Sequence, residues 1–147
     1  MKTLKHKLAG KRTYLDSNII IYALEGFEVY SVILSNFFNL VDHEFIEIVT
    51  SQLSLAECLV KPYAEKREDI IKIYREFIRT SNTLKVQELT ENILIDSAKI
   101  RAKEKELKLP DAIHIATALF RNCSLFLTND KRIKSSVIDI IYLDDLK

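Results

Sequence analysis

The most continuous apolar pattern in the chain lies in its second half. Leu109 to Leu119 is small and apolar nearly all round, which predicts a helix packed on most sides. Pro110 suits the first helical turn, and Asp111 faces the positive end of the helix dipole. Leu125 to Leu127 is a short continuous apolar run, typical of a buried parallel strand. This stretch therefore predicts a helix that begins with a carboxylate, followed by a strand that leads to Asp130.

The remaining apolar segments alternate between strand-like and helix-like spacing. Further strands are predicted at Thr13–Leu15, Ile46–Val49, Leu84–Leu89 and Val137–Leu143. Helices are predicted after Asp16, over Val29–Val41, from Ser54, over Arg67–Arg79 and from Thr90 to Leu107. This alternation predicts an α/β fold with a central parallel sheet of about five strands and helices on both faces. We expect a single domain over residues 1–147, with a basic N-terminal extension over residues 1–11.

Composition narrows the classes of function. The chain has 147 residues and a net charge of +1, so any site for a polyanion must be a local patch. The only glycines, Gly10 and Gly26, exclude a phosphate-binding glycine loop. No apolar run approaches the roughly 20 residues that span a bilayer, so no membrane contact is expected. Cys58 and Cys123 are expected to be buried thiols, which together with the missing signal peptide predicts a cytoplasmic setting.

Four acidic residues occupy comparable positions in these elements. Asp16, Glu57 and Asp130 each follow a strand, directly or through a short turn, and Asp111 opens a helix. In a parallel α/β sheet the carboxyl ends of strands and the amino ends of helices lie at the same edge, where such sheets bind ligands. Each acid has a simpler explanation when taken alone: Asp16 is a helix cap, and Glu57 completes a capping box that begins at Ser54. Because all four fall at one edge, we expect them to converge on a single site.

Converging carboxylates require a cation. Two carboxylates about 4 Å apart repel by about 4 kcal/mol at an effective dielectric constant of about 20, and neither Lys nor Arg adjoins Asp16, Glu57 or Asp111 in sequence. Oxygen ligands favour Mg²⁺ or Mn²⁺ over Zn²⁺, and a hydrated Mg²⁺ suits phosphate chemistry. Without metal, crowding should raise the pKa of at least one of the four acids. Neutralising one, for example by Asp130→Asn, is then expected to stabilise the metal-free protein.

Four motifs together resemble the PIN domain family, and they cover nearly the whole chain. They are Tyr14-Leu15-Asp16-Ser17-Asn18, Ser54-x-x-Glu57, Asp111-Ala112-Ile113-His114-Ile115-Ala116-Thr117-Ala118 and Leu127-Thr128-Asn129-Asp130, in the family's order and at its usual spacing. The nearest branch is the small single-domain toxins of VapBC toxin–antitoxin pairs. The chain departs from many such toxins in its basic extension before Asp16.

The resemblance implies a fold, an activity and partners. It implies a Mg²⁺- or Mn²⁺-dependent endoribonuclease on a five-stranded parallel sheet, with an antitoxin that blocks the site and a toxin that dimerises. It also assigns residues: Asp16, Glu57, Asp111 and Asp130 as the acidic metal site, with Thr128 and Asn18 as polar helpers.

Other interpretations remain open at this point. A PIN-like module that binds RNA or protein without cutting is the main alternative, although none of the four acids is lost. A haloacid-dehalogenase phosphatase requires a second Asp two residues after the first, where Asn18 stands, and a receiver domain requires an acceptor Asp where Thr90 stands. His114, one turn after Asp111, is expected to be a packed or supporting histidine rather than a general base.

Overall fold

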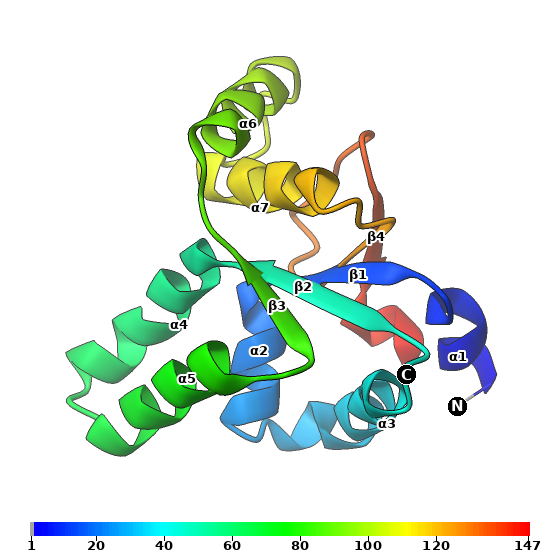
Figure 1. Ribbon diagram of the computed structural model, residues 1–147, viewed down its shortest axis with the longest axis vertical. Helices are drawn as coiled ribbons and strands as arrows, with labels where there is room; N and C mark the ends of the chain where they lie inside the picture. The colour runs from blue at the N-terminus through cyan, green and yellow to red at the C-terminus, as the bar shows by residue number, and fades with distance from the viewer. Residues whose placement is uncertain (1) are drawn as a thin grey trace.

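A five-stranded parallel sheet forms the centre of the protein, seen in a computed structural model that describes residues 2–147 (Figure 1). The strands are β1 (Arg12–Leu15), β2 (Glu47–Ser51), β3 (Leu84–Gln87), β4 (Leu125–Thr128) and β5 (Asp139–Tyr142). The helices are α1 (Lys2–Leu8), α2 (Ser17–Leu24), α3 (Ser31–Asp42), α4 (Gln52–Ala64), α5 (Glu68–Thr80), α6 (Glu91–Lys103) and α7 (Leu109–Phe120), with 3-10 turns η1 (Glu28–Tyr30) and η2 (Leu143–Leu146). The α/β fold with five parallel strands predicted from the sequence is confirmed.

Alternating strand residues divide the interior into two apolar layers. Leu15 and Leu127 face a layer shared with α1 to α5, whereas Tyr14 and Phe126 face a layer shared with α7. Figure 1 shows α6 and α7 on one side of the sheet and α2 to α5 on the other. Because both faces are covered, the strands are buried on both sides, which explains their continuous apolar sequence.

The order of the strands indicates where a sheet of this kind binds a ligand. The sheet order is β3-β2-β1-β4-β5, so the chain leaves β1 in one direction and returns to its other side with β4. Leu15 pairs with Leu127, and the Asp16 N–H donates to the Leu127 carbonyl at 3.0 Å. Asp16 follows Leu15, and Thr128 follows Leu127. Both residues therefore lie at the carboxyl ends of β1 and β4, where the strand order reverses.

The basic extension is part of the folded core. Helix α1 places Leu4 and Leu8, one turn apart, in the layer beneath the sheet, where each is almost fully buried. The Lys5 ammonium lies 4.1 Å from the centroid of the Phe45 ring. Residues 2–8 are thus an integral helix, and Met1 lies outside the described residues.

Several helix boundaries differ from those predicted. Helix α4 begins at Gln52 and not at Ser54, with the Ser51 hydroxyl accepting from the Leu53 N–H at 3.2 Å, which excludes the alternative of a capping box from Ser54 to Glu57. Helix α6 is capped by Thr90 as predicted, but it ends at Lys103. The cause in α4 is that Ser51 and Ser54 are equally suited to a cap by sequence, and only tertiary contacts decide between them.

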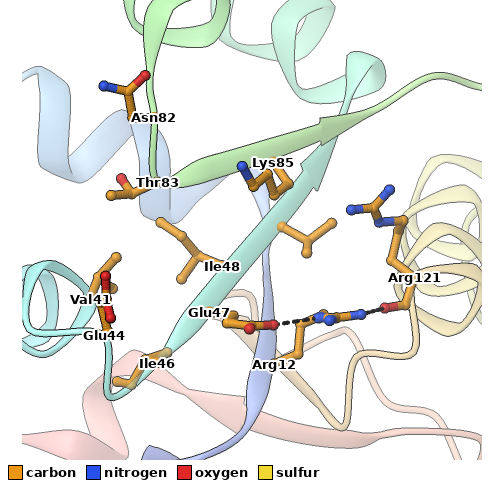
Figure 2. Close-up of a pocket in the computed structure, with 11 residues that line it drawn as sticks. Arg12, Val41, Glu44, Ile46, Glu47, Ile48, Asn82, Thr83, Lys85 and Arg121 are labelled. Carbon is orange, nitrogen blue, oxygen red and sulfur yellow. Dashed lines mark hydrogen bonds and ion pairs between the residues drawn. The ribbon is translucent and has the colours of Figure 1, made fainter.

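Arg12 connects three elements at the amino ends of β1 and β2, on the far side of the sheet from Asp16. Its Nε donates to Glu47 at 2.8 Å and its guanidinium also donates to the Arg121 carbonyl at 2.7 Å, which ties β1 to β2 and to the end of α7 (Figure 2). These residues and Lys85 border a cavity of about 460 Å³. None of the acids expected in the site lines this cavity, which lies where β1 and β2 begin.

Both cysteines are free and buried, as predicted. Burial raises the pKa of the Cys58 and Cys123 thiols to about 12, so both stay protonated near neutral pH. Among the described residues, no single helix is long and apolar enough to cross a membrane; one bent pair, Ser17–Leu24 with Glu28–Asp42, qualifies by length and composition alone.

Candidate metal centre

Asp16 anchors the site at the end of β1. It is 4% exposed and caps α2, with Oδ1 accepting from the Ser17 N–H at 2.8 Å. Its other oxygen, Oδ2, accepts from the Thr128 hydroxyl at 2.7 Å and from the Asn18 amide at 3.1 Å. Both oxygens of the carboxylate therefore accept hydrogen bonds, and the cap and ligand interpretations of Asp16 are compatible.

Thr128 and Asn18 connect β4 to α2. Because the Thr128 hydroxyl donates to Asp16, its oxygen is free to accept from the Asn18 amide and from the Asp130 N–H, each at 3.1 Å. The Asn129 N–H donates in turn to Asn18 Oδ1 at 3.1 Å. The two predicted polar helpers thus lie against Asp16 and fix its orientation.

Glu57 reaches the site from the second turn of α4. The Thr50 hydroxyl donates to the Leu15 carbonyl at 2.9 Å, so the Ser54 hydroxyl, 2.6 Å away, must donate to Thr50. These contacts bind the first turn of α4 to the end of β1, one residue before Asp16. Glu57, one turn after Ser54, is consequently directed toward Asp16 rather than toward a capping position.

His114 joins three elements at the centre of this group. The ring is fully buried; Nε2 lies 2.5 Å from Glu57 Oε1 and 3.7 Å from Asp16 Oδ1, and Nδ1 lies 2.6 Å from the Tyr14 hydroxyl. Burial raises the pKa of Tyr14, which therefore keeps its proton and donates to Nδ1 when the imidazole is neutral. Nε2–H then donates to Glu57. Burial lowers the pKa of His114, but contact with Glu57 and the charge of Asp16 outweigh it and raise the pKa overall.

Asp111 lies in the first turn of α7, where the sequence placed it. Its pKa is raised from 3.8 to about 6, first by burial and then by the charge of Asp16, with smaller contributions from Asp130 and Glu57. Burial is the larger cause of the raised pKa, so the like-charge crowding expected from the sequence contributes to it without accounting for it alone. The charges of the other three acids therefore act on Asp111 across this edge.

Asp130 differs from the other three acids because it has a cationic partner. Arg132 donates to both of its carboxylate oxygens at 2.9 Å, and the Arg132 N–H adds a third bond at 3.0 Å. This contact lowers the pKa of Asp130. Local sequence could not indicate this contact, because Lys131 is the nearer basic neighbour of Asp130 and instead binds Asp144 at 2.7 Å.

The donors that lie closest together suit a divalent cation. One ligand atom each from Asp16, Glu57 and His114 falls within 4.8 Å of the others. The carboxylates of Asp16 and Glu57, with Asp111 near them, provide the oxygen ligands that Mg²⁺ and Mn²⁺ prefer. Since both His114 nitrogens already have partners, the ring is better placed to orient Glu57 than to bind the ion itself. The ring is thus a packed, supporting histidine, as the sequence suggested, and the contact between Asp130 and Arg132 is the main feature that sequence reasoning missed.

Comparisons with known proteins agree with this architecture. The model of the PIN domain family matches residues 13–136. The comparison with curated proteins gave no match. Among solved structures, the chain is similar to one in VapBC2 from Rickettsia felis bound to a promoter DNA fragment, with TM-score 0.68, 17% identity and coverage of 89% of this chain and 98% of that chain.

Two further structures show the same likeness. A chain in a toxin–antitoxin complex from Klebsiella pneumoniae gives TM-score 0.62 at 19% identity, covering 89% of this chain and 97% of that chain. The VapC20 toxin of Mycobacterium tuberculosis, which cleaves the sarcin–ricin loop, gives TM-score 0.60 at 15% identity, covering 78% and 86%. At these identities the likeness establishes the fold.

Proposed function

The chain belongs to the PIN domain family, and on that premise we propose that it is a metal-dependent endoribonuclease that acts as the toxin of a toxin–antitoxin pair. The observation that carries the proposal is the convergence of Asp16 and Glu57 within 4.8 Å on His114, at the edge where the strand order reverses. The charges of Asp16 and Glu57 raise the pKa of Asp111, which supports including Asp111 as a third carboxylate of the site.

The residues of the site would have different roles in RNA hydrolysis. Asp16, Glu57 and Asp111 would hold Mg²⁺ or Mn²⁺, with Asp130 at the margin of the site. A bound divalent ion supplies an acidified water and neutralises charge on the phosphodiester. Thr128 and Asn18 keep Asp16 in one orientation. In the overall reaction the oxygen of water forms a bond to phosphorus, the bond from phosphorus to the departing ribose oxygen breaks, and that oxygen takes up a proton.

The proposed partners follow from the structural relatives. Two of the similar chains come from complexes of toxin and antitoxin, and the third is a toxin that cleaves the sarcin–ricin loop. We extend to this chain an RNA substrate, a cognate antitoxin that covers the acidic edge, a homodimeric state and a cytoplasmic location. The buried free thiols are compatible with a reducing compartment.

Cleavage of RNA by the purified protein tests the activity. We expect cleavage with Mg²⁺ or Mn²⁺, none with EDTA, and none with Asp111→Asn, which preserves the shape of the side chain but removes its charge. Equal cleavage with and without EDTA would contradict the mechanism. A folded protein that binds RNA but cuts none under any metal would instead support the non-catalytic binding module.

Expression in cells tests the toxin assignment separately. The wild-type chain should slow growth, Asp16→Asn should not, and co-expression of the antitoxin should restore growth. Unimpaired growth with a demonstrably active enzyme would leave the nuclease in place and contradict the toxin role.

A further inference from the structure

Arg132 places a positive charge directly beside the proposed metal site. Its guanidinium donates from Nε and Nη2 to the two carboxylate oxygens of Asp130, each at 2.9 Å. The contact with Asp130 raises the pKa of Arg132, and the charge of Asp111 contributes to the same shift. The guanidinium therefore lies within the field of two of the four acids, and in the metal-free protein it supplies Asp130 with the positive charge that a metal ion would otherwise supply.

The backbone around Asp130 is fixed independently of the guanidinium. Ile133 is 1% exposed, its N–H donates to the Asp130 carbonyl at 3.1 Å, and its carbonyl accepts from the Tyr142 hydroxyl at 2.6 Å. The Asp130 N–H donates to the Thr128 hydroxyl oxygen at 3.1 Å, and the Arg132 N–H donates to Asp130 Oδ1 at 3.0 Å. Because these bonds do not involve the guanidinium, Asp130 keeps its place when the guanidinium leaves.

The guanidinium itself is weakly held. The side chain of Arg132 is 76% exposed and that of Asp130 is 25% exposed. Exposed ion pairs contribute little, because water solvates both groups and the pair restricts long side chains. A divalent cation carries twice the charge and binds carboxylate oxygens directly. A metal ion beside Asp130 should therefore displace the guanidinium readily.

A displaced guanidinium has another partner in the substrate of the proposed nuclease. The planar fork that fits the two oxygens of a carboxylate fits two phosphate oxygens in the same way. Lys131, the other basic residue directly after Asp130, is committed elsewhere, since its ammonium contacts Asp144 at 2.7 Å. Of these two basic residues, Arg132 is therefore the one that can contact either an acid of the metal site or a phosphate beside it.

We propose that Arg132 is a positioning residue with two alternating partners: it holds Asp130 in the metal-free protein, and it contacts a phosphate of the RNA backbone once a divalent cation binds beside Asp130. The inference rests on the proposed function and adds to it a coupling between metal and substrate. Because the metal releases the guanidinium and the phosphate then retains it, each ligand favours the binding of the other.

The affinity for Mn²⁺ without RNA tests the competition and requires no nuclease activity. Arg132→Gln removes the competing guanidinium and should tighten Mn²⁺ binding about two- to fivefold in isothermal titration calorimetry. Arg67→Gln is the matched control, because Arg67 makes the same forked contact with Asp69, at 3.1 and 3.0 Å, at the turn between α4 and α5. This control should leave the Mn²⁺ affinity unchanged.

A double-mutant cycle separates competition at Asp130 from general repulsion between Mn²⁺ and a nearby cation. In an Asp130→Asn background there is no carboxylate at this position for the two cations to share, so Arg132→Gln should change the Mn²⁺ affinity by less than about 1.5-fold. Unchanged or weaker Mn²⁺ binding by folded Arg132→Gln would overturn the proposal, and so would equal tightening in both backgrounds.

Cleavage kinetics at saturating Mn²⁺ test the second partner. Arg132→Gln should raise KM for RNA at least about fivefold with kcat changed less than about twofold, and Arg67→Gln should change neither. The slope of log KM against log salt concentration should fall by about one, as expected for the loss of one phosphate contact.

The two experiments fail in different ways. An unchanged KM and salt slope in Arg132→Gln would overturn the phosphate contact and leave the nuclease intact. The expected tightening of Mn²⁺ binding in a protein that cuts no RNA would support the competition at Asp130 and contradict the nuclease.

Discussion

His114 Nε2 lies 2.5 Å from Glu57 Oε1, and this contact joins helix α7 to helix α4 across the end of β1. The ring is fixed from behind by the Tyr14 hydroxyl, 2.6 Å from Nδ1. A carboxylate on an exposed helix would otherwise sample several rotamers. The buried imidazole confines Glu57 to the side facing Asp16, which is the property a metal ligand requires.

Removing this imidazole should weaken metal binding. His114→Leu fills the buried volume but leaves Glu57 without its donor, and we expect about 10- to 100-fold weaker Mn²⁺ affinity by isothermal titration calorimetry. Tyr14→Phe keeps the contact with Glu57 and should have a smaller effect. Unchanged Mn²⁺ affinity in folded His114→Leu would show that the ring has no role in positioning Glu57.

Asp111 should make the stability of the metal-free protein depend on pH. Its folded pKa of about 6 lies above the ordinary 3.8, so the folded state binds this proton more tightly than the unfolded state does. The ionised group therefore destabilises the fold, increasingly as pH rises from 3.8 to about 6 and constantly above that range. Asp111→Asn should stabilise the protein at pH 7 by about 1 kcal/mol, after allowance for solvent screening, and by almost nothing below the unfolded pKa. Thermal unfolding in EDTA at several pH values measures the difference; a constant difference across that range would contradict this origin.

Asp130→Asn should act in the opposite direction. The Arg132 guanidinium lowers the pKa of Asp130, so this carboxylate stabilises the fold above its unfolded pKa, and that contribution is lost as pH falls through the folded pKa. Asp130→Asn should therefore reduce metal-free stability slightly at pH 7, which reverses the expectation from the sequence. Arg132→Gln provides the matched removal of the partner. A higher melting temperature for Asp130→Asn in EDTA would mean that repulsion from the other acids outweighs Arg132.

The contrast between these acids shows what the sequence can and cannot predict. Asp16 and Asp111 were predictable because their positions depend on where a strand ends and a helix begins. Glu57 was expected near the site because it follows a strand through a short turn, but its direction was not predictable, since it depends on the contact of Ser54 with Thr50 that orients α4. Either Lys131 or Arg132 could have contacted Asp130. Tertiary packing, which no local sequence pattern encodes, brings Arg132 to Asp130 and Lys131 to Asp144.

Helix α1 gives a second example. Leu4 and Leu8 are one turn apart among lysines, but a seven-residue segment is too short for periodicity to identify a helix. Because Leu8 is fully buried, Leu8→Ala should destabilise the protein by about 2–5 kcal/mol in chemical denaturation, whereas Lys7→Ala should have little effect. Equal, small effects of the two substitutions would indicate a dispensable tail.

The location of the metal is the central claim, and anomalous diffraction from crystals grown with Mn²⁺ tests it most directly. We predict a single strong manganese peak within coordination distance of the carboxylates of Asp16 and Glu57, and its loss in crystals of Asp16→Asn. A manganese peak elsewhere, or none at saturating Mn²⁺, would contradict the assignment of this edge as the metal centre.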